Sequence, residues 1–326
     1  MPTPGWARAA LSQPVFTGVS RQHLAELIAE LADPWLTLRD SVLSERRGHD
    51  RLRAAGAGPD HELVFVDRVI ATLVVLRFQL PHQALAELYQ TSRFTIGRAV
   101  REIRGLLAAR GFAVPDRPGV RLRTLEDVFA FAEAEGVTLR IDGTEVQVRR
   151  PKAHRAGRKA YISGKKKQNT LKAVVVSDGQ GRCLWLGAIR PGRMHDVTQV
   201  RTEGIEEQLR LHPNVRAEVD SGYTGLARDF PGQVSAPPKK PGQDAGPGER
   251  NLYANTRHRQ SQRRIMVEHA IAEPKQWRSM QRWTGQRQDL PEVMAAIGGL
   301  VSDRAAKRAT VRMPGTDLVL ARVTAC

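Results

Sequence analysis

Cysteine is almost absent from this sequence, and acidic residues are scarce beside basic ones. Only Cys183 and Cys326 occur among 326 residues, which is too few for a disulfide framework or a cysteine-based zinc site. The chain carries 34 Asp and Glu against 51 Lys and Arg, a formal net charge of +17, and its pI is about 10.7. This imbalance indicates a polyanionic partner, most simply a nucleic acid.

Long apolar runs are also missing. The most apolar stretch, residues 63–80, is interrupted by Asp67, Arg68 and Arg77, which predicts a buried helix rather than a membrane span. Residues 1–20 carry no apolar core of the secretory kind. We therefore expect a soluble cytoplasmic protein without a membrane partner.

The length and composition are those of a globular protein. A chain of 326 residues, 41% of them hydrophobic and 26% charged, is long enough for two domains with cores of their own. The expected organisation is a helical region at 1–60, a helix-turn-helix domain at 61–112, a connecting helix at 113–136, an α/β domain at 137–309 and a tail at 310–326.

A pair of short helices is predicted in the N-terminal half. Residues 81–90 begin with a proline, and residues 91–107 carry apolar residues at helical spacing after a capping Thr91 or Ser92. The second helix is rich in arginine, which is typical of a helix-turn-helix. A small bundle with a solvated basic face is the alternative. The residues expected near DNA are Arg93, Thr95, Arg98 and Arg101.

The remaining pattern predicts a mixed sheet with helices. We expect helices at 20–31 (capped by Ser20), 36–47, 62–80, 125–135, 197–211, 261–277 and 291–307, a linker at 54–59, strands at 137–148 and 215–220, a hairpin at 171–192 turning at Asp178-Gly179, and a loop at 229–250. Strands interleaved with helices in this order predict an α/β domain with a mixed sheet.

Three acidic residues stand out by their positions. Asp142 is expected to end the first strand, Asp220 follows a later strand in a similar context, and Glu268 lies on an apolar stretch where a buried carboxylate would need a cation. Carboxylates from strand ends and a packed helix can form an all-oxygen site for Mg²⁺ or Mn²⁺. Such a site can hold two ions and act on a phosphodiester. The alternative for each acid alone is a turn aspartate or a solvated glutamate.

Two basic stretches flank these acids. Residues 146–172 contain ten Lys and Arg and no acid, including Lys165, Lys166 and Lys167. The second stretch includes Arg257, Arg263 and Arg264. Because like charges repel unless an anion lies between them, both stretches predict contacts to a phosphate backbone, although a solvated surface is the alternative.

The motifs IDGTEV, YISGKKKQNTLKAVVV, RPGRMHD, VDSGY, PPKKP and RRIMVEHAIAEPKQW occur in this order. In this order they resemble the DDE transposases of bacterial insertion sequences, and most closely the DDE superfamily endonuclease group related to Harbinger elements. The resemblance covers about residues 139–277, with a family-like helix-turn-helix at about 62–110. It implies an RNase H-like catalytic domain with a mixed sheet, preceded by the all-α domain.

By motif match, the resemblance makes Asp142, Asp220 and Glu268 the catalytic and metal-binding triad. It implies Mg²⁺ as cofactor, with Mn²⁺ as a substitute and two ions at the site. The implied partners are the terminal inverted repeats and target DNA, bound by a homodimer or higher oligomer at the bacterial nucleoid. Further expected DNA contacts are Lys239, Lys240 and Lys275.

Two features near the motifs need separate interpretation. Asp196 competes for the role of second acid, but we expect it to be a helix N-cap and assign His195 and Asp196 supporting roles near the site. Pro274 departs from the family pattern and predicts a kink or end of the helix within two turns after Glu268.

The function expected from the resemblance is transposition by binding of terminal repeats, metal-dependent DNA cleavage and strand transfer. A catalytically inactive or domesticated DNA-binding protein is one alternative. A DNA endonuclease without strand transfer is the other.

Overall fold

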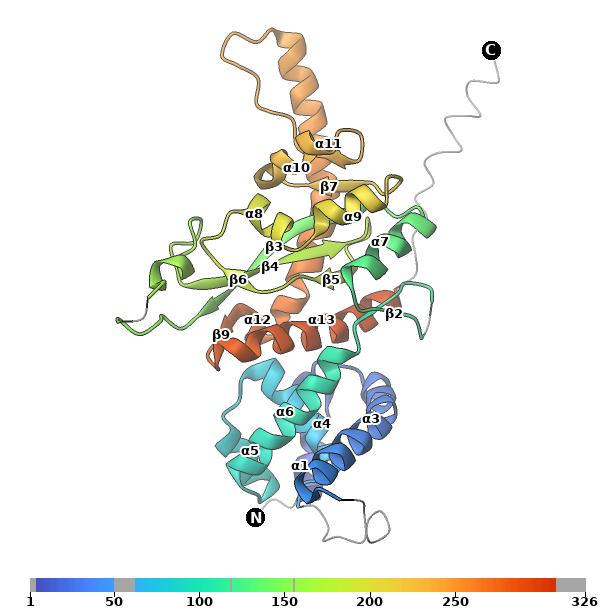
Figure 1. Ribbon diagram of the computed structural model, residues 1–326, viewed down its shortest axis with the longest axis vertical. Helices are drawn as coiled ribbons and strands as arrows, with labels where there is room; N and C mark the ends of the chain where they lie inside the picture. Colours follow the sequence, from blue (N-terminus) through green and yellow to red (C-terminus); the bar gives the residue numbers. More distant parts are fainter. Residues whose placement is uncertain (1–3, 50–61, 118, 155, 309–326) are drawn as a thin grey trace.

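The structure is a computed structural model that describes residues 4–49, 62–117, 119–154 and 156–308. Figure 1 shows a layer of helices from the N-terminal part of the chain below a sheet, with one long helix, α11, projecting above it. The helices that precede the sheet are α1 (Pro4–Leu11), α2 (Pro14–Thr17), α3 (Arg21–Arg47), α4 (Phe65–Phe78), α5 (His82–Tyr89), α6 (Arg93–Ala109) and α7 (Leu125–Ala134), with the short strands β1 (Phe112–Ala113) and β2 (Arg121–Leu122) before α7.

Helix α3 differs from its prediction because it is one continuous helix. The sequence predicted two helices, but Pro34 lies inside α3 without ending it. The predicted cap is confirmed, since the Ser20 hydroxyl accepts a hydrogen bond from the His23 backbone N–H at 3.1 Å. The predicted linker at 54–59 lies outside the described residues.

Helix α4 is the predicted buried helix. Its charged residues Asp67 and Arg68 are buried and each is paired: Asp67 with Arg8 at 2.8 Å and Arg68 with Glu102 at 2.9 Å. Pairing makes their burial tolerable. Within the described ranges, no helix is long and apolar enough to cross a membrane.

Helices α5 and α6 form the predicted helical pair. Pro81 is the N-cap of α5 rather than its first helical residue. Ser92 is the cap of α6, where its hydroxyl accepts from the Thr95 backbone N–H at 3.1 Å. The connection between the two helices is therefore residues 90–92, a short turn.

The mixed sheet is confirmed. Its main path runs β5 (Cys183–Leu186), β4 (Thr170–Ser177), β3 (Leu139–Val148), β7 (Ala217–Val219) and β8 (Val234–Ser235), with β6 (Arg190–Pro191) on β4 and β9 (Arg282–Trp283) on β3. The pairs β3–β4 and β4–β5 are antiparallel, whereas β7 is parallel to β3 and β8 is parallel to β7. The predicted hairpin turn lies between Ser177 and Cys183.

Three later elements differ from their predictions. The predicted helix at 197–211 is two helices, α8 (Asp196–Thr202) and α9 (Ile205–Leu211), because Gly204 lies between them in the left-handed region at φ 81°. The predicted loop at 229–250 contains strand β8. Helix α11 (Pro247–Ala272) begins well before the predicted residue 261 and ends just before Pro274, as the proline predicted.

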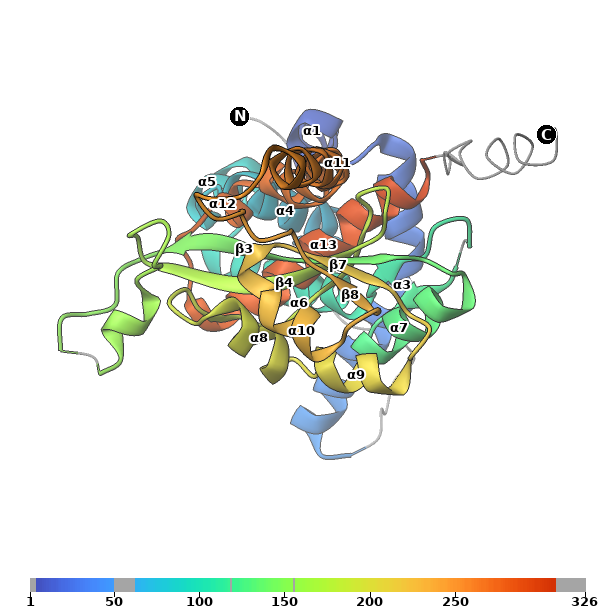
Figure 2. The same cartoon turned by 90° about the horizontal axis from the view of Figure 1, so that it is seen from above.

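The remaining helices complete the two faces of the sheet. They are η1 (Arg158–Tyr161), η2 (Ser221–Tyr223), α10 (Thr224–Asp229), η3 (Pro274–Gln276), α12 (Arg278–Gln281), η4 (Arg287–Asp289) and α13 (Leu290–Ala306). Figure 2 shows α8, α9 and α10 on one side of the strands and α11 on the other.

Helix α13 connects the N-terminal helices to the sheet. One apolar cluster includes buried residues of α1, α3, α4, α5 and α6 together with Leu300 and Val301 of α13 and Val146 of β3. A second cluster fills the space between the sheet and helices α7 to α10. The N-terminal helices therefore share the first cluster with α13 and the sheet, whereas the second cluster belongs to the sheet and the helices α7 to α10.

Candidate active site

Asp142 lies on the central strand β3, beside the start of the loop that follows β7. It is the fourth residue of a ten-residue strand, so the prediction that it ends the strand is wrong. The parallel pairing of β3 with β7 matches Ile141 to Val219. Asp142 follows Ile141, and Asp220 follows Val219. Residues that follow a matched pair on neighbouring parallel strands lie side by side.

Two glycines leave room around these carboxylates. A Cβ on Gly222 would lie 3.0 Å from an oxygen of Asp220 and 2.8 Å from an oxygen of Asp196. A Cβ on Gly143 would lie 3.1 Å from the Tyr223 hydroxyl. Any larger residue at either position would therefore press on the polar groups gathered here.

Tyr223 lies at the centre of this arrangement. Its side chain is buried, with 1% of the residue exposed, and its hydroxyl makes no hydrogen bond within the structure. Burial raises the pKa of Tyr223, and the charges of Asp196, Asp142 and Asp220 raise it further. The phenol therefore stays neutral in the field of three carboxylates.

Asp196 does not have its predicted role. It is the first residue of α8, and His195, an exposed residue, is the N-cap without a side-chain capping bond. The Asp196 carboxylate instead accepts a hydrogen bond from Lys172 Nζ at 2.6 Å. The N-cap prediction is wrong because the buried ammonium of Lys172, on β4, attracts the carboxylate toward the sheet.

Glu268 lies near the end of α11, a helix that packs against β3 and β4. The sequence suggested a buried carboxylate, but Glu268 is exposed. In the part of the chain that the structure describes, no three His, Cys, Asp or Glu side chains are arranged to hold a metal ion. The structure thus places Asp142 and Asp220 at neighbouring positions of the sheet and Glu268 at an exposed position of α11.

Lys275 is a predicted DNA contact whose charge interacts with the acids of β3. It is half-buried in η3, after the proline that ends α11. Burial lowers the pKa of Lys275, and the charge of Lys166 lowers it further, whereas Asp142 and Glu145 oppose that shift. The lysine is therefore close enough to the carboxylates of β3 and to the basic turn at 165–167 for their charges to affect its pKa.

The other predicted DNA contacts occupy exposed positions on several elements. The turn of Lys165–Lys167 is tied to β3, because Ser163 donates to Glu145 at 3.1 Å and accepts from the Lys166 backbone N–H at 3.1 Å. The side chains that lie exposed are Arg93, Arg98, Arg101, Lys165, Lys166, Lys167, Lys239, Lys240 and Arg257, and Thr95 is half-buried. The side chains of Arg263 and Arg264 lie outside the described residues.

One cation of residues 146–172 and one arginine of α6 are structural rather than free for phosphate. Lys172, counted among the ten cations of residues 146–172, is 5% exposed and paired with Asp196. In α6, Arg104 is buried and pairs with Glu292 at 2.8 Å and Asp289 at 3.4 Å. Both cations therefore contribute to the fold.

Sequence reasoning missed the roles of Lys172 and Tyr223. Lys172 occurs in the run LKAVVVS, where an ammonium among apolar residues of a buried strand signals a paired charge. Tyr223 follows Asp220 in VDSGY, but which side chains surround a tyrosine is set by contacts between distant segments.

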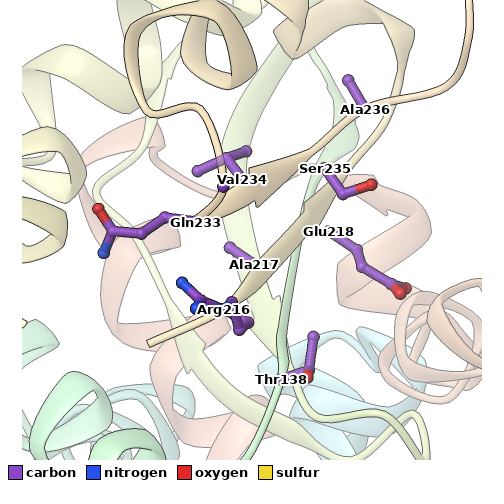
Figure 3. A pocket seen from close by; sticks show the side chains of 9 residues that line it. Thr138, Arg216, Ala217, Glu218, Gln233, Val234, Ser235 and Ala236 are labelled. Carbon is purple, nitrogen blue, oxygen red and sulfur yellow. The ribbon is translucent and has the colours of Figure 1, made fainter. Parts of the chain in front are cut away.

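An open hollow lies elsewhere on the sheet, at the edge strand β8. It has a volume of about 550 Å³ and is lined by residues at the start of β7 and along β8, among them Arg216, Glu218 and Ser235 (Figure 3). These residues precede Asp220 on the strand or come from the sheet edge, so the hollow is separate from the group of acids.

Part of the chain is similar to a known protein family. The family model described as DDE superfamily endonuclease matches residues 141–301. A Mos1 mariner paired-end complex with Mn has 13% sequence identity and a TM-score of 0.18, covering 92% of this chain and 99% of that chain. A Mos1 strand transfer complex has 15% identity and a TM-score of 0.17, covering 92% and 98%.

The family match says more about this chain than the structural similarities do. No curated protein matches the chain, and structural similarities at such TM-scores carry no argument about the fold. The family match rests on the sequence, and it spans β3, the strand of Asp142, through most of α13. Residues 141–301, just under half of the chain, are thus similar to the DDE superfamily endonucleases, which supports a DDE transposase family.

Proposed function

We propose that this protein is a DNA transposase that binds terminal inverted repeats and catalyses metal-dependent strand cleavage and strand transfer. The observation that carries the proposal is the adjacent placement of Asp142 and Asp220 within the segment that matches the DDE superfamily endonucleases. In this proposal the mixed sheet is an RNase H-like sheet, and α5 with α6 is a helix-turn-helix.

The donor chemistry at the acids suits a hard divalent cation. Asp142, Asp220 and Glu268 would hold Mg²⁺, or Mn²⁺ in its place, since carboxylate oxygens are the ligands these ions prefer. Two ions held there would activate an attacking oxygen and stabilise the leaving one. Glu268, which is exposed on α11, would be the ligand contributed by a helix rather than by the strands.

The basic residues would hold the DNA substrate. The exposed arginines of α6 would contact one DNA segment, and Lys165–Lys167, Lys239, Lys240, Arg257, Arg263, Arg264 and Lys275 would contact the backbone near the acids. Lys275 would approach a phosphate at the site, since it is close enough to Asp142 and Lys166 for their charges to affect its pKa. We further propose that the protein acts as a homodimer or higher oligomer on DNA.

The test is Mg²⁺-dependent cleavage of DNA that carries the repeats flanking the gene, with wild type and Glu268→Gln compared. Cleavage by wild type alone supports the enzyme and the role of Glu268 together. Joining of the cut end to a second duplex separates a transposase from an endonuclease. If both proteins bind DNA and neither cuts it with Mg²⁺ or Mn²⁺, the protein only binds DNA.

A further inference from the structure

The ion pair between Lys172 and Asp196 lies directly beside the acids of the proposed site. Lys172 is on β4, opposite Glu145 of β3, and its side chain is 6% exposed. Its Nζ lies 2.6 Å from one carboxylate oxygen of Asp196. A buried ammonium is costly without a charged partner, so Lys172 needs Asp196 on the sheet side of α8.

The second oxygen of Asp196 faces the loop that carries Asp220. This oxygen lies 2.8 Å, and an oxygen of Asp220 lies 3.0 Å, from the point that a Cβ of Gly222 would occupy. Both carboxylates therefore lie close to one backbone position. Like charges so close repel each other in a partly buried site.

The hydroxyl of Tyr223 lies in the same region as these carboxylates. It is fully buried, it makes no hydrogen bond in the structure, and it lies against Gly143, the neighbour of Asp142. A buried donor without a partner is costly. The polar groups around it are thus arranged for a site and not only for packing.

We propose that Lys172 is a positioning residue of the carboxylate site: it holds Asp196 beside Asp220 but outside the group that binds the metal. This inference rests on the proposed function, because it concerns the carboxylates assigned there to the metal. Lys172 neutralises the charge of Asp196 and fixes its direction. Asp196 then supports the loop of Asp220 without becoming a ligand.

Removing the lysine has a consequence that a purely structural role would not produce. The Asp196 side chain is 42% exposed, so without Lys172 it can turn toward Asp220. Asp196 would then be a fourth carboxylate beside the cation and would raise the affinity for the metal, because affinity rises with the number of charged ligands. Cleavage falls, because the metal is then held in the wrong arrangement.

The experiment measures Mn²⁺ binding to the full-length protein by calorimetry or by the electron paramagnetic resonance of free Mn²⁺. Lys172→Met is expected to bind Mn²⁺ about threefold to tenfold more tightly than wild type. The double variant Lys172→Met with Asp196→Asn is expected to return to wild-type affinity. Asp196→Asn alone is expected to stay within about threefold of wild type.

A matched control removes a buried ion pair elsewhere on the sheet. Arg182 pairs with Asp178 at 2.5 Å in the β4–β5 turn, and both side chains are nearly as buried as that of Lys172. Arg182→Met is expected to lower the unfolding temperature without changing Mn²⁺ affinity. If Lys172→Met alone does not fold, the affinity of Asp196→Asn decides the question.

Three results overturn the inference. Lys172→Met binding Mn²⁺ no more tightly than Arg182→Met would make the pair purely structural. Asp196→Asn losing as much affinity as Asp142→Asn would make Asp196 a ligand. If wild type itself binds no Mn²⁺, the proposed function fails together with the inference. If wild type binds Mn²⁺ and Lys172→Met binds it with the same affinity, only the inference is rejected.

Discussion

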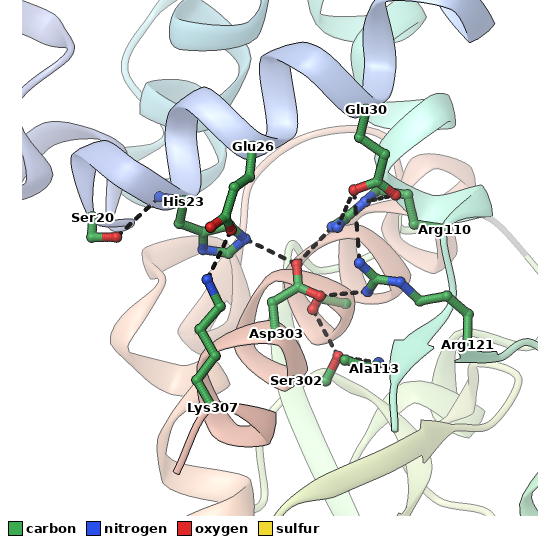
Figure 4. A network of polar contacts seen from close by, with 11 residues as sticks. Ser20, His23, Glu26, Glu30, Arg110, Ala113, Arg121, Ser302, Asp303 and Lys307 are labelled. Atoms are coloured by element: carbon green, nitrogen blue, oxygen red, sulfur yellow. Dashed lines mark hydrogen bonds and ion pairs between the residues drawn. The ribbon is translucent and has the colours of Figure 1, made fainter. Parts of the chain in front are cut away.

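Two groups of charged side chains in this molecule have opposite electrostatic character. At the junction of α3, α6, β2 and α13, Asp303 accepts hydrogen bonds from His23 and Arg110 and pairs with Arg121 (Figure 4). At the acid site, the carboxylates of Asp142, Asp196 and Asp220 surround the phenol of Tyr223. One carboxylate is thus held by cations, and one neutral hydroxyl is held among anions.

The pKa shifts report this difference. Burial alone would raise the pKa of Asp303, but the hydrogen bond from His23 and the charges of Arg110 and Arg121 outweigh it and lower the pKa to about 2. At the acid site, burial and carboxylates together raise the pKa of Tyr223. A balanced group stabilises the fold, whereas an excess of negative charge is suited to attract a cation.

The largest expected effect is on the acid site. Asp142→Asn or Asp220→Asn is expected to reduce metal-dependent DNA cleavage by about a thousandfold or more, because each removes a charge that the cation needs. DNA binding is expected to survive, since it depends on the basic residues. Cleavage assays and gel-shift assays on the same preparations measure the two effects.

Asp229→Asn is the control for these variants. Asp229 pairs with Arg201 and Arg228 at the exposed surface, so its loss removes an aspartate without touching the site. Cleavage by Asp142→Asn at the rate of Asp229→Asn would contradict the assignment of the acids.

The next largest effect is expected on the free energy of unfolding, through the ion pairs of Asp303. Asp303→Asn is expected to lower the free energy of unfolding by about 3 kcal/mol or more, because it leaves Arg110 and Arg121 buried with less counter-charge. Arg110 would retain Glu30, at 2.6 Å. Chemical denaturation measures the change, and a loss below about 1 kcal/mol would show that the network adds little.

Low pH should weaken the ion pairs of Asp303 over a defined pH range. The pKa of Asp303 is lowered from 3.8 to about 2, so its stabilisation is complete above about pH 4 and is lost as the pH falls toward 2. This contribution corresponds to about 2 kcal/mol. The stability difference between wild type and Asp303→Asn should shrink by that amount on acidification, and a constant difference would contradict the shift.

The two kinds of arginine on α6 offer a smaller test. Arg98→Ala with Arg101→Ala, both exposed, is expected to weaken DNA binding about tenfold at low salt and to reduce its salt dependence. Arg104→Ala, which breaks pairs with Glu292 and Asp289, is expected to lower stability instead. Equal DNA affinity for wild type and the double variant would exclude this face of α6 as a DNA contact.

The smallest effect is expected for Tyr223→Phe. Because the hydroxyl makes no hydrogen bond within the structure, its removal should change the free energy of unfolding by less than about 1 kcal/mol. Thermal unfolding without metal measures this change. A loss above about 2 kcal/mol would show that the hydroxyl has a partner in solution.

The sequence predicted the sheet well because local patterns determine it. The apolar run of β4, the Asp178-Gly179 turn and the strand at Val215–Asp220 each follow from neighbouring residues. The continuity of α3 through Pro34 was missed because packing of the helix against α4 and α6 outweighs a local helix breaker.

The site was predicted in part for the same reason. Asp142 and Asp220 could be paired from their strands, since parallel neighbours align their ends. The exposure of Glu268 and the partnership of Lys172 with Asp196 depend on how α11 and α8 pack on the sheet. Contacts between segments that are far apart in the sequence cannot be predicted from the residues next to each partner.

Helix α13 has a consequence for how the protein can be divided. Its buried residues, such as Ile297 and Leu300, lie in the same cluster as Leu73 of α4 and Ile103 of α6. A fragment ending before residue 290 would expose that apolar surface to water and would therefore tend to aggregate. The N-terminal helices and the sheet should therefore be expressed, exchanged between relatives and unfolded only as one unit.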